Sequence, residues 1–419
     1  GQLQWVVISF VLTFGGLLLA AGQLGDRVGH QRMMTFGAAG SVLAMAACAL
    51  APTFGLFIAA RVFQGLTTAA VMAAGPALAS LAAGPAARGR AIGVFQLSAG
   101  IGGALGPLIG GPLVNLGGWP TVFWFRVPIA IALLLLARSV APDRTTTETP
   151  TDIRGAILTA LALAGGLLVV SSARELGLGS VLLWLAVALT VGITAAYRAH
   201  SRRISEPIIN LRLFRDRRFA TANLLNLTAH ATMFVSWLLL PALLVNEIGL
   251  STLQGGVVLA ASPAAMALVS PLAGRWSDRS RPERPVIAGL ATEMMGLWLL
   301  ASLDEQSSAI AAGLAMATIG LGLGLFAGPN MTLVMSALPT ERQGVASGLA
   351  LLTRIAGIIV GVAGSRALFD ELESDRGFVS AFGITATVNA IVTGGALVLA
   401  VLVATTGNRR SPAIGLNRA

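Results

Sequence analysis

The sequence contains no lysine, one cysteine and one tyrosine, and charged residues of both signs are few. Only 11% of the 419 residues are charged, whereas a typical soluble domain has about 25%. The mean hydropathy is +0.80. Since Cys48 is the only cysteine, an intrachain disulfide and a cysteine-based metal site are excluded. This composition excludes an ordinary soluble domain and indicates a chain that crosses the lipid bilayer many times.

Residues that carry enzyme chemistry are also scarce. The three histidines, His30, His200 and His230, have no nucleophile–base spacing, and no metal-ligand cluster or Walker-type phosphate loop occurs. The sequence therefore predicts no enzyme activity, no metal site and no cofactor. The formal net charge of +10 does not indicate a nucleic-acid partner, because an excess of arginine in a membrane protein belongs to its cytoplasmic face.

Thirteen apolar segments are long enough to cross a bilayer as helices, since a span needs about 20 residues and lipid cannot satisfy an open backbone. They lie near 4–22, 33–51, 54–83, 91–113, 120–137, 154–173, 179–197, 219–245, 252–273, 284–302, 307–337, 344–367 and 379–405. The chain is thus predicted to be an all-α polytopic membrane protein.

Arginine is concentrated in alternate loops between these segments. The rich loops lie around 27–32, 88–90, 138–144, 198–218, 275–281, 342 and 409–418, whereas the opposite loops hold only Arg174, Arg366 and Arg376. Because cytoplasmic loops carry the basic excess, we expect the first set and the C-terminus to be cytoplasmic. The use of arginine alone is typical of a GC-rich bacterial genome, so the expected location is a bacterial cytoplasmic (inner) membrane.

Short landmarks recur at a nearly constant distance along the chain. The polar turn at 22–32 has a shorter copy at 274–279; both read Gly, three residues, Asp, Arg, and Asp26 and Asp278 are 252 positions apart. The pairs Gly75-Pro76 and Gly328-Pro329 are 253 apart, and Arg88 and Arg342 are 254 apart. The agreement predicts two related halves, which is a common plan for membrane carriers.

The repeat also sets the expected domains. The counterpart of span 219–245 would fall before residue 1, so we expect fourteen helices natively and thirteen here; thirteen genuine spans is the alternative. Spans 154–173 and 179–197 have no counterpart and predict an inserted hairpin. The expected units are a first bundle at 1–137, a linker plus hairpin at 138–203, a second bundle at 204–405 and a cytoplasmic tail at 406–419.

Four stretches resemble motifs of the Major Facilitator Superfamily, specifically of its fourteen-helix drug:proton antiporter branch. They lie at 22–32, 61–65, 102–111 and 206–214, and their order extends the resemblance over essentially the whole chain. Two departures stand out. The first helix of the family, with an acidic residue tied to proton coupling, has no counterpart, and Arg126 stands where the family usually has Asn.

The resemblance implies a fold of two pseudo-symmetric six-helix bundles plus an inserted hairpin. It also implies a monomeric exporter that is driven by the proton gradient, with protons and amphipathic small molecules, cationic or neutral, as partners. Alternating access around a midplane site would carry the substrate. The alternatives are a dedicated exporter of one endogenous metabolite or antibiotic, and a non-transporting truncated paralogue.

Asp26 can accept hydrogen bonds from the start of a neighbouring helix, and contacts of this kind would open and close a gate. The alternative is a static turn, but the copy at Asp278 favours a gate in both halves. The predicted gating residues are Gly22, Gly25, Asp26, Arg27, Gly29, Arg32, Gly274, Asp278 and Arg279. The resemblance associates the antiporter motif at Gly102, Gly106, Pro107, Gly110 and Gly111 with export; ordinary close packing of small residues is the alternative.

Ionisable groups within a bilayer are costly and so are functional candidates. The proton-coupling candidates are Arg61, His230, Arg354 and Glu293; a structural ion pair for Arg61 and a packing role for His230 are the alternatives. The substrate-cavity candidates are Gln64, Asn223, Asn226, Met233, Trp237, Phe326 and Asn330, for most of which core packing or lipid contact is the competing interpretation.

Overall fold

A computed structural model describes residues 2–140, 152–176, 179–204, 207, 211–338 and 342–407. Within these ranges the chain forms thirteen α-helices and no strand. The helices are α1 (Gln2–Val28), α2 (His30–Leu50), α3 (Phe54–Ala83), α4 (Arg88–Gly117), α5 (Trp119–Ser139), α6 (Ile153–Leu176), α7 (Val181–Ser201), α8 (Arg217–Ala242), α9 (Thr252–Arg279), α10 (Glu283–Ala301), α11 (Ala309–Ser336), α12 (Gln343–Arg376) and α13 (Phe378–Gly407). Short turns η1 (Pro85–Ala87), η2 (Leu211–Arg215) and η3 (Leu243–Glu247) connect some of them.

Each predicted span coincides with one of these helices. By length and composition alone, nine helices of the described chain could cross a membrane, including the continuous stretch Arg217–Glu247. The prediction of an all-helical membrane protein is confirmed. The linker residues 141–151, Glu206 and the tail residues 408–419, which the sequence assigned to a connection, a motif and a cytoplasmic tail, lie outside the described ranges.

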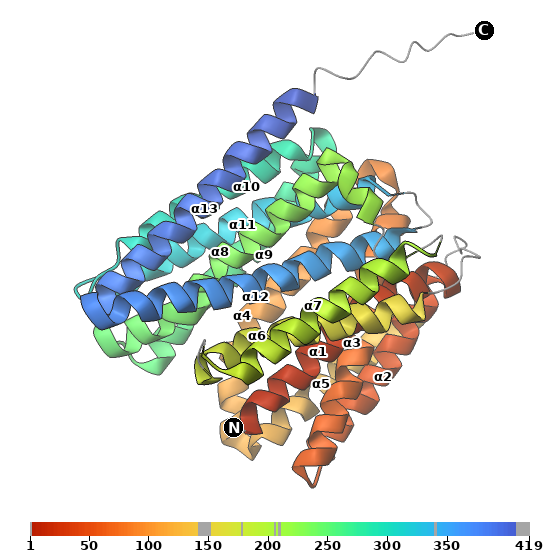
Figure 1. Cartoon of the computed structure of the whole chain (residues 1–419), viewed down its shortest axis with the longest axis horizontal. Coiled ribbons are helices and arrows are strands. Elements are labelled where there is room, and N and C mark those ends of the chain that lie inside the picture. The colour runs from red at the N-terminus through yellow and green to blue at the C-terminus, as the bar shows by residue number, and fades with distance from the viewer. Residues whose placement is uncertain are drawn as a thin grey trace.

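The helices form two groups with the predicted hairpin beside them (Figure 1). Helices α1 to α5 form one group, and α8 to α13 form the other. The hairpin helices α6 and α7 pack on each other, and α6 also contacts α1. Two helix pairs join the groups: α4 packs along α9, and α1 packs along α12.

The repeated landmarks occupy equivalent places in the two groups. Asp26 lies near the end of α1 and Asp278 near the end of α9, while Pro76 and Pro329 lie inside α3 and α11. Arg88 begins α4, and Arg342 directly precedes α12. The helix pairs α1–α12 and α4–α9 are therefore related by the internal repeat.

Local chemistry explains several helix ends. Gly29, between α1 and α2, has φ 99°, a conformation that costs glycine little and other residues much. Asp216 caps α8 by accepting from the backbone N–H groups of Arg218 and Phe219. After Pro241, the end of α8 continues into a π-helical turn, Leu243–Glu247. Proline removes one backbone hydrogen bond and so permits such a local change of the helix. The apolar pattern did not predict this turn, because it does not report which backbone groups are bonded.

Candidate functional site

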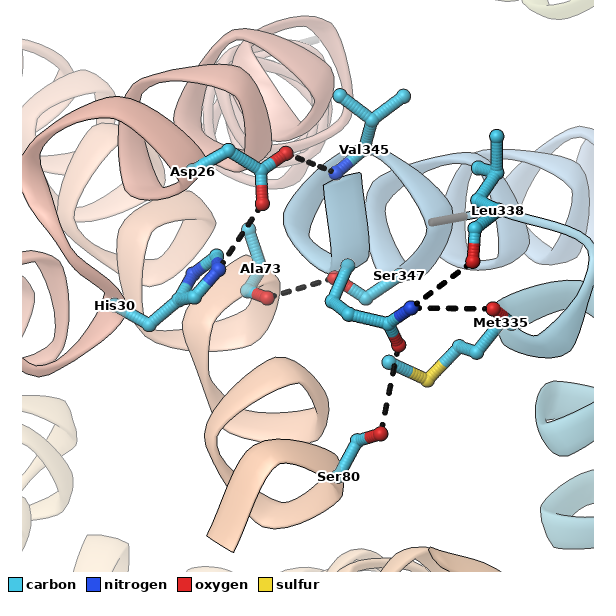
Figure 2. A network of polar contacts seen from close by, with 9 residues as sticks. Asp26, His30, Ala73, Ser80, Met335, Leu338, Val345 and Ser347 are labelled. Carbon is cyan, nitrogen blue, oxygen red and sulfur yellow. Dashed lines mark hydrogen bonds and ion pairs between the residues drawn. The ribbon is translucent and has the colours of Figure 1, made fainter. Parts of the chain in front are cut away.

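Asp26 joins the end of α1 to the beginning of α12. Its Oδ2 accepts a hydrogen bond of 3.0 Å from the backbone N–H of Val345, and its Oδ1 lies 3.0 Å from His30 Nε2 (Figure 2). The Asp26 side chain is 3% exposed. A carboxylate at the positive end of a helix is favourable, so Asp26 holds α12 of one group against α1 of the other.

Asp278 makes the matching contact at the other helix pair. Its Oδ1 accepts from the backbone N–H of Gly89 at 2.7 Å, and its Oδ2 accepts from that of Arg90 at 2.8 Å. The start of α4 is thereby bound to the end of α9. The two aspartates of the internal repeat thus each cap the first turn of a helix in the opposite group.

Further hydrogen bonds cross between the groups at the same end of the molecule. Ser347 Oγ on α12 donates to the carbonyl oxygen of Ala73 on α3 at 2.7 Å, and Ser80 Oγ lies 3.4 Å from Gln343 Oε1 (Figure 2). Arg88 donates to Ser336 Oγ at 3.3 Å. Together with the two aspartate caps, these contacts join the two groups at one end of the molecule, which is called the closed end below.

The predicted gating glycines allow neighbouring helices and side chains to approach closely, and the predicted gating arginines have exposed side chains. A Cβ on Gly274 would overlap the carbonyl oxygen of Gly89, and one on Gly25 would meet the His30 ring. Gly22 and Gly29 are buried as well. The side chains of Arg27, Arg32 and Arg279 are exposed, which suits cytoplasmic surface charges.

Close packing of α4 on α9 uses other glycines than those of the antiporter motif. A Cβ on Gly93 would meet the Ser270 carbonyl oxygen, and one on Gly100 would meet Ala267 and Pro263. At Gly102, Gly106 and Gly110, by contrast, no described atom lies within 4 Å of such a Cβ. Pro107 and Gly111 also lie in α4, but their side chains are outside the described set.

A pocket lies between the two groups, beyond the closed end. Its walls come from α4, α8, α11 and α12. The lining residues are Phe95, Gln96, Asn226, His230, Ala327, Asn330, Met331, Ala350, Leu351 and Arg354. The fold therefore brings together four predicted residues, namely His230, Arg354, Asn226 and Asn330.

Five lining residues were not predicted, namely Phe95, Gln96, Ala327, Ala350 and Leu351. Gln96 carried a usable signal, because it is the only amide side chain within its apolar segment. The other four carried none, since apolar residues on a membrane helix face lipid, core or cavity with the same sequence pattern.

Two predicted coupling residues lie elsewhere. Arg61 contacts the backbone oxygen of Val6 at 3.0 Å, Gln64 Oε1 at 2.5 Å and the Phe10 ring, all within the first group. Glu293 on α10 is 0% exposed and accepts a 3.1 Å hydrogen bond from Thr232 on α8. Neither lines the pocket.

The remaining cavity candidates pack inside the helix groups. Gln64 is fully buried beside Met45 and Arg61. Asn223 bonds to the Phe219 carbonyl oxygen and to Thr353. The other three, Met233, Trp237 and Phe326, pack in hydrophobic clusters of the second group.

The sequence profile of the Major Facilitator Superfamily matches residues 1–362. The chain belongs to this family. The multidrug resistance protein Stp of Mycobacterium tuberculosis is 33% identical over 367 residues, which are 86% of this chain and 67% of Stp. The riboflavin transporter RibZ of Clostridioides difficile is 28% identical over 365 residues, 86% of this chain and 78% of RibZ.

A solved structure shows the same fold. The human organic anion transporter MFSD10 superposes with a TM-score of 0.66 at 17% identity, over 94% of this chain and 83% of that one. The predicted Major Facilitator fold is confirmed, and so is the prediction of a transporter, not an enzyme. The chain is a multi-span membrane protein of a bacterial transporter family with multidrug and antibiotic resistance relatives.

Proposed function

We propose that this protein is a proton-driven exporter of amphipathic small molecules that works by alternating access. The observation that carries the proposal is the matched pair of caps, in which Asp26 binds the start of α12 and Asp278 binds the start of α4. Both caps join one helix group to the other at one end only. Breaking both would let the groups separate at that end, and re-forming them would close it.

The strength of the hydrogen bonds in the two aspartate caps suits a gate that opens and closes reversibly. A hydrogen bond to a charged group contributes roughly 1.5–3 kcal/mol, so each cap is strong enough to hold a closed state and weak enough to break during a transport cycle. The glycines at 89, 93 and 274 let the helices approach closely when the gate shuts. In this proposal the described conformation is closed to the cytoplasm, with the C-terminus on that side.

His230 is the coupling residue that the geometry favours. Its Nδ1 lies 2.8 Å from the carbonyl oxygen of Asn226, and because a carbonyl can only accept, Nδ1 carries a proton there. Nε2 then remains to bind and release a proton beside the pocket. A proton on Nε2 and a substrate in the same pocket would alter each other's binding, which would couple their movements.

The experiment is transport in everted membrane vesicles that contain the protein. A respiration-driven proton gradient is recorded with a pH-sensitive dye, and amphipathic compounds are added. We expect partial collapse of the gradient with a substrate, and none with vesicles from the Asp26→Ala, Asp278→Ala double variant. A gradient that no compound disturbs, with the protein shown to be folded and inserted, contradicts the proposal.

A dedicated exporter of one endogenous compound is the second candidate. The similarity to RibZ, described as a riboflavin transporter, supports it. The same vesicles distinguish the two: a multidrug exporter responds to several unrelated scaffolds, and a dedicated exporter responds to one. The chain is proposed to act as a monomer in the bacterial cytoplasmic membrane, without a cofactor.

A further inference from the structure

The pocket between the helix groups contains polar groups that the protein itself does not engage. Within the described part of the chain, Arg354 and Gln96 make no hydrogen bond or ion pair, although Gln96 is only 8% exposed. Asn330 is 1% exposed and its Nδ2 donates to the Ala222 carbonyl oxygen, which fixes the orientation of the amide. Its Oδ1 is buried without a described partner. Unsatisfied polar groups at these depths are uncommon and require an explanation.

The charge of the pocket is of one sign. Arg354 supplies a guanidinium group, and none of the described residues that line the pocket is acidic. The buried carboxylate of the same half, Glu293, does not line the pocket and bonds instead to Thr232. Leaving a cation unpaired within a bilayer costs several kcal/mol, and an anion beside Arg354 would offset that cost.

We propose that the pocket binds the anionic group of the transported molecule, a carboxylate or a similar oxyanion, through Arg354 and Gln96. This inference rests on the proposed transport function and names the chemical class of its substrate. The arginine offers up to five N–H donors in a planar fork that matches a carboxylate. The Gln96 amide adds a neutral donor from α4, in the other half of the molecule.

The other walls fit the rest of an amphipathic acid. Phe95, Met331 and Leu351 supply apolar surface for its hydrocarbon part, and Asn330 Oδ1 can accept from a hydroxyl or N–H group on it. Arg354 lies eleven residues after Gln343 at the start of α12. At 1.5 Å per residue it is about 16 Å from the closed end, near the middle of a hydrocarbon core of about 30 Å.

This assignment departs from the cationic or neutral substrate that the family resemblance implied. A cationic molecule would meet the charge of Arg354 with no described carboxylate to offset it. A substrate whose carboxylate lies against Arg354 also brings residues of α4 and α12 to one ligand. Substrate binding would thus span both halves, as alternating access requires.

The test is equilibrium binding of a matched acid and amide to the protein in nanodiscs. The probes are 1-pyrenebutyric acid and 1-pyrenebutyramide, which differ only in the charged group, followed by fluorescence anisotropy. In phosphatidylcholine nanodiscs we expect the acid to bind more tightly than the amide. The Arg354→Gln change should weaken the acid roughly 10–100-fold, the range of a charge-assisted hydrogen bond, and leave the amide within about threefold.

Two further variants keep the test decisive. Arg366→Gln is the matched control, because Arg366 lies on the same helix and is already paired with Asp370 at 2.8 Å; it should leave acid binding unchanged. Gln96→Leu should weaken the acid more than the amide, because a hydrogen bond to a charged acceptor is about twice as strong as one to a neutral carbonyl, and it serves if Arg354→Gln does not fold. Equal binding of acid and amide by the unaltered protein, or equal loss of both in Arg354→Gln, overturns the inference.

A lipid headgroup is the competing source of the anion. Nanodiscs that contain phosphatidylglycerol separate the two: if this lipid weakens acid binding in the unaltered protein, and Arg354→Gln removes that competition, the pocket holds a lipid and the substrate assignment is wrong. Binding needs no proton gradient. Selective acid binding without gradient-driven export would therefore refute the proposed function alone, and export without acid selectivity would refute this inference alone.

Discussion

Asp278 on α9 and Gly89 on α4 are joined across the two halves of the molecule by a hydrogen bond of 2.7 Å from backbone N–H to carboxylate. The equivalent bond runs from Val345 on α12 to Asp26 on α1 at 3.0 Å. The two bonds are related by the internal repeat, and both lie at the closed end. If the contacts work as a gate and the pocket works as a coupling site, changes at each should have separate and measurable effects.

Removing one cap should open the cytoplasmic end. In Asp278→Ala we expect a buried cysteine at position 277 to react with a maleimide roughly tenfold faster, since a lost charge-assisted bond shifts the equilibrium by about that factor. Ser277→Cys suits the purpose, because Ser277 is 3% exposed and its Oγ has no described partner. Cys48 stays buried and serves as the background.

Asp216→Ala is the control for this prediction. Asp216 caps α8 through the same kind of bond, but to residues of its own helix. Its loss should leave the labelling rate unchanged. If Asp216→Ala and Asp278→Ala accelerate labelling equally, the Asp278 contact acts through general stability and not as a gate.

Enlarging a glycine between α4 and α9 should prevent closure. Gly93→Leu would drive a side chain into the Ser270 backbone and the neighbouring Gly274, and overpacking of this kind costs about 1–3 kcal/mol or more. We expect gradient-driven export in vesicles to be lost while the protein still inserts. Gly313→Ala on α11, where a Cβ meets nothing within 4 Å, should export normally; normal export by Gly93→Leu would contradict the prediction.

The buried hydrogen bond between Thr232 and Glu293 should support the second helix group. Thr232→Val keeps the shape of the side chain but removes the donor to Glu293 Oε1 and a partner of Thr393 at 2.9 Å. We expect the free energy of unfolding to fall by about 1–3 kcal/mol, measured as a lower melting temperature in detergent. Thr228→Val, on an exposed face of α8, should have little effect.

Proton coupling should depend on His230 and not on Glu293. His230→Asn retains a donor to the Asn226 carbonyl oxygen but has no group that titrates near neutral pH. We expect probe binding to persist and substrate-induced proton movement to fall to the level of empty vesicles. Glu293→Gln, an isosteric change away from the pocket, should keep coupled export. The opposite pattern would assign coupling to Glu293.

Three glycines of the motif at 102–111 have no close packing partner in the described part of the chain. Gly102, Gly106 and Gly110 have no described atom where a Cβ would stand, although small residues at helical spacing are typical of helix contacts. Sequence spacing alone cannot say which face of α4 meets α9. That choice depends on how the whole helix is rotated, which is decided by Gly89, Gly93 and Gly100.

The sequence by itself determined the class, the family, the thirteen helices and the internal repeat, because long apolar segments and recurring polar turns are local signals. It also identified Asp26 and Asp278 as acceptors for a helix start. Which start each one meets was decided only by the tertiary structure. The partners are 319 and 189 positions away, and local patterns contain no information about such distances.

The residues of the pocket also show what the sequence could predict and what only the tertiary structure decided. His230, Arg354, Asn226 and Asn330 could be predicted, since a polar group in a membrane helix is costly and therefore conspicuous. Gln64, Asn223 and Glu293 carried the same signal, yet each makes its hydrogen bonds inside its own half. Only the packing of α4, α8, α11 and α12 around one space separates the groups that line it from those that hold helices together, because both kinds of role demand a polar residue in an apolar segment.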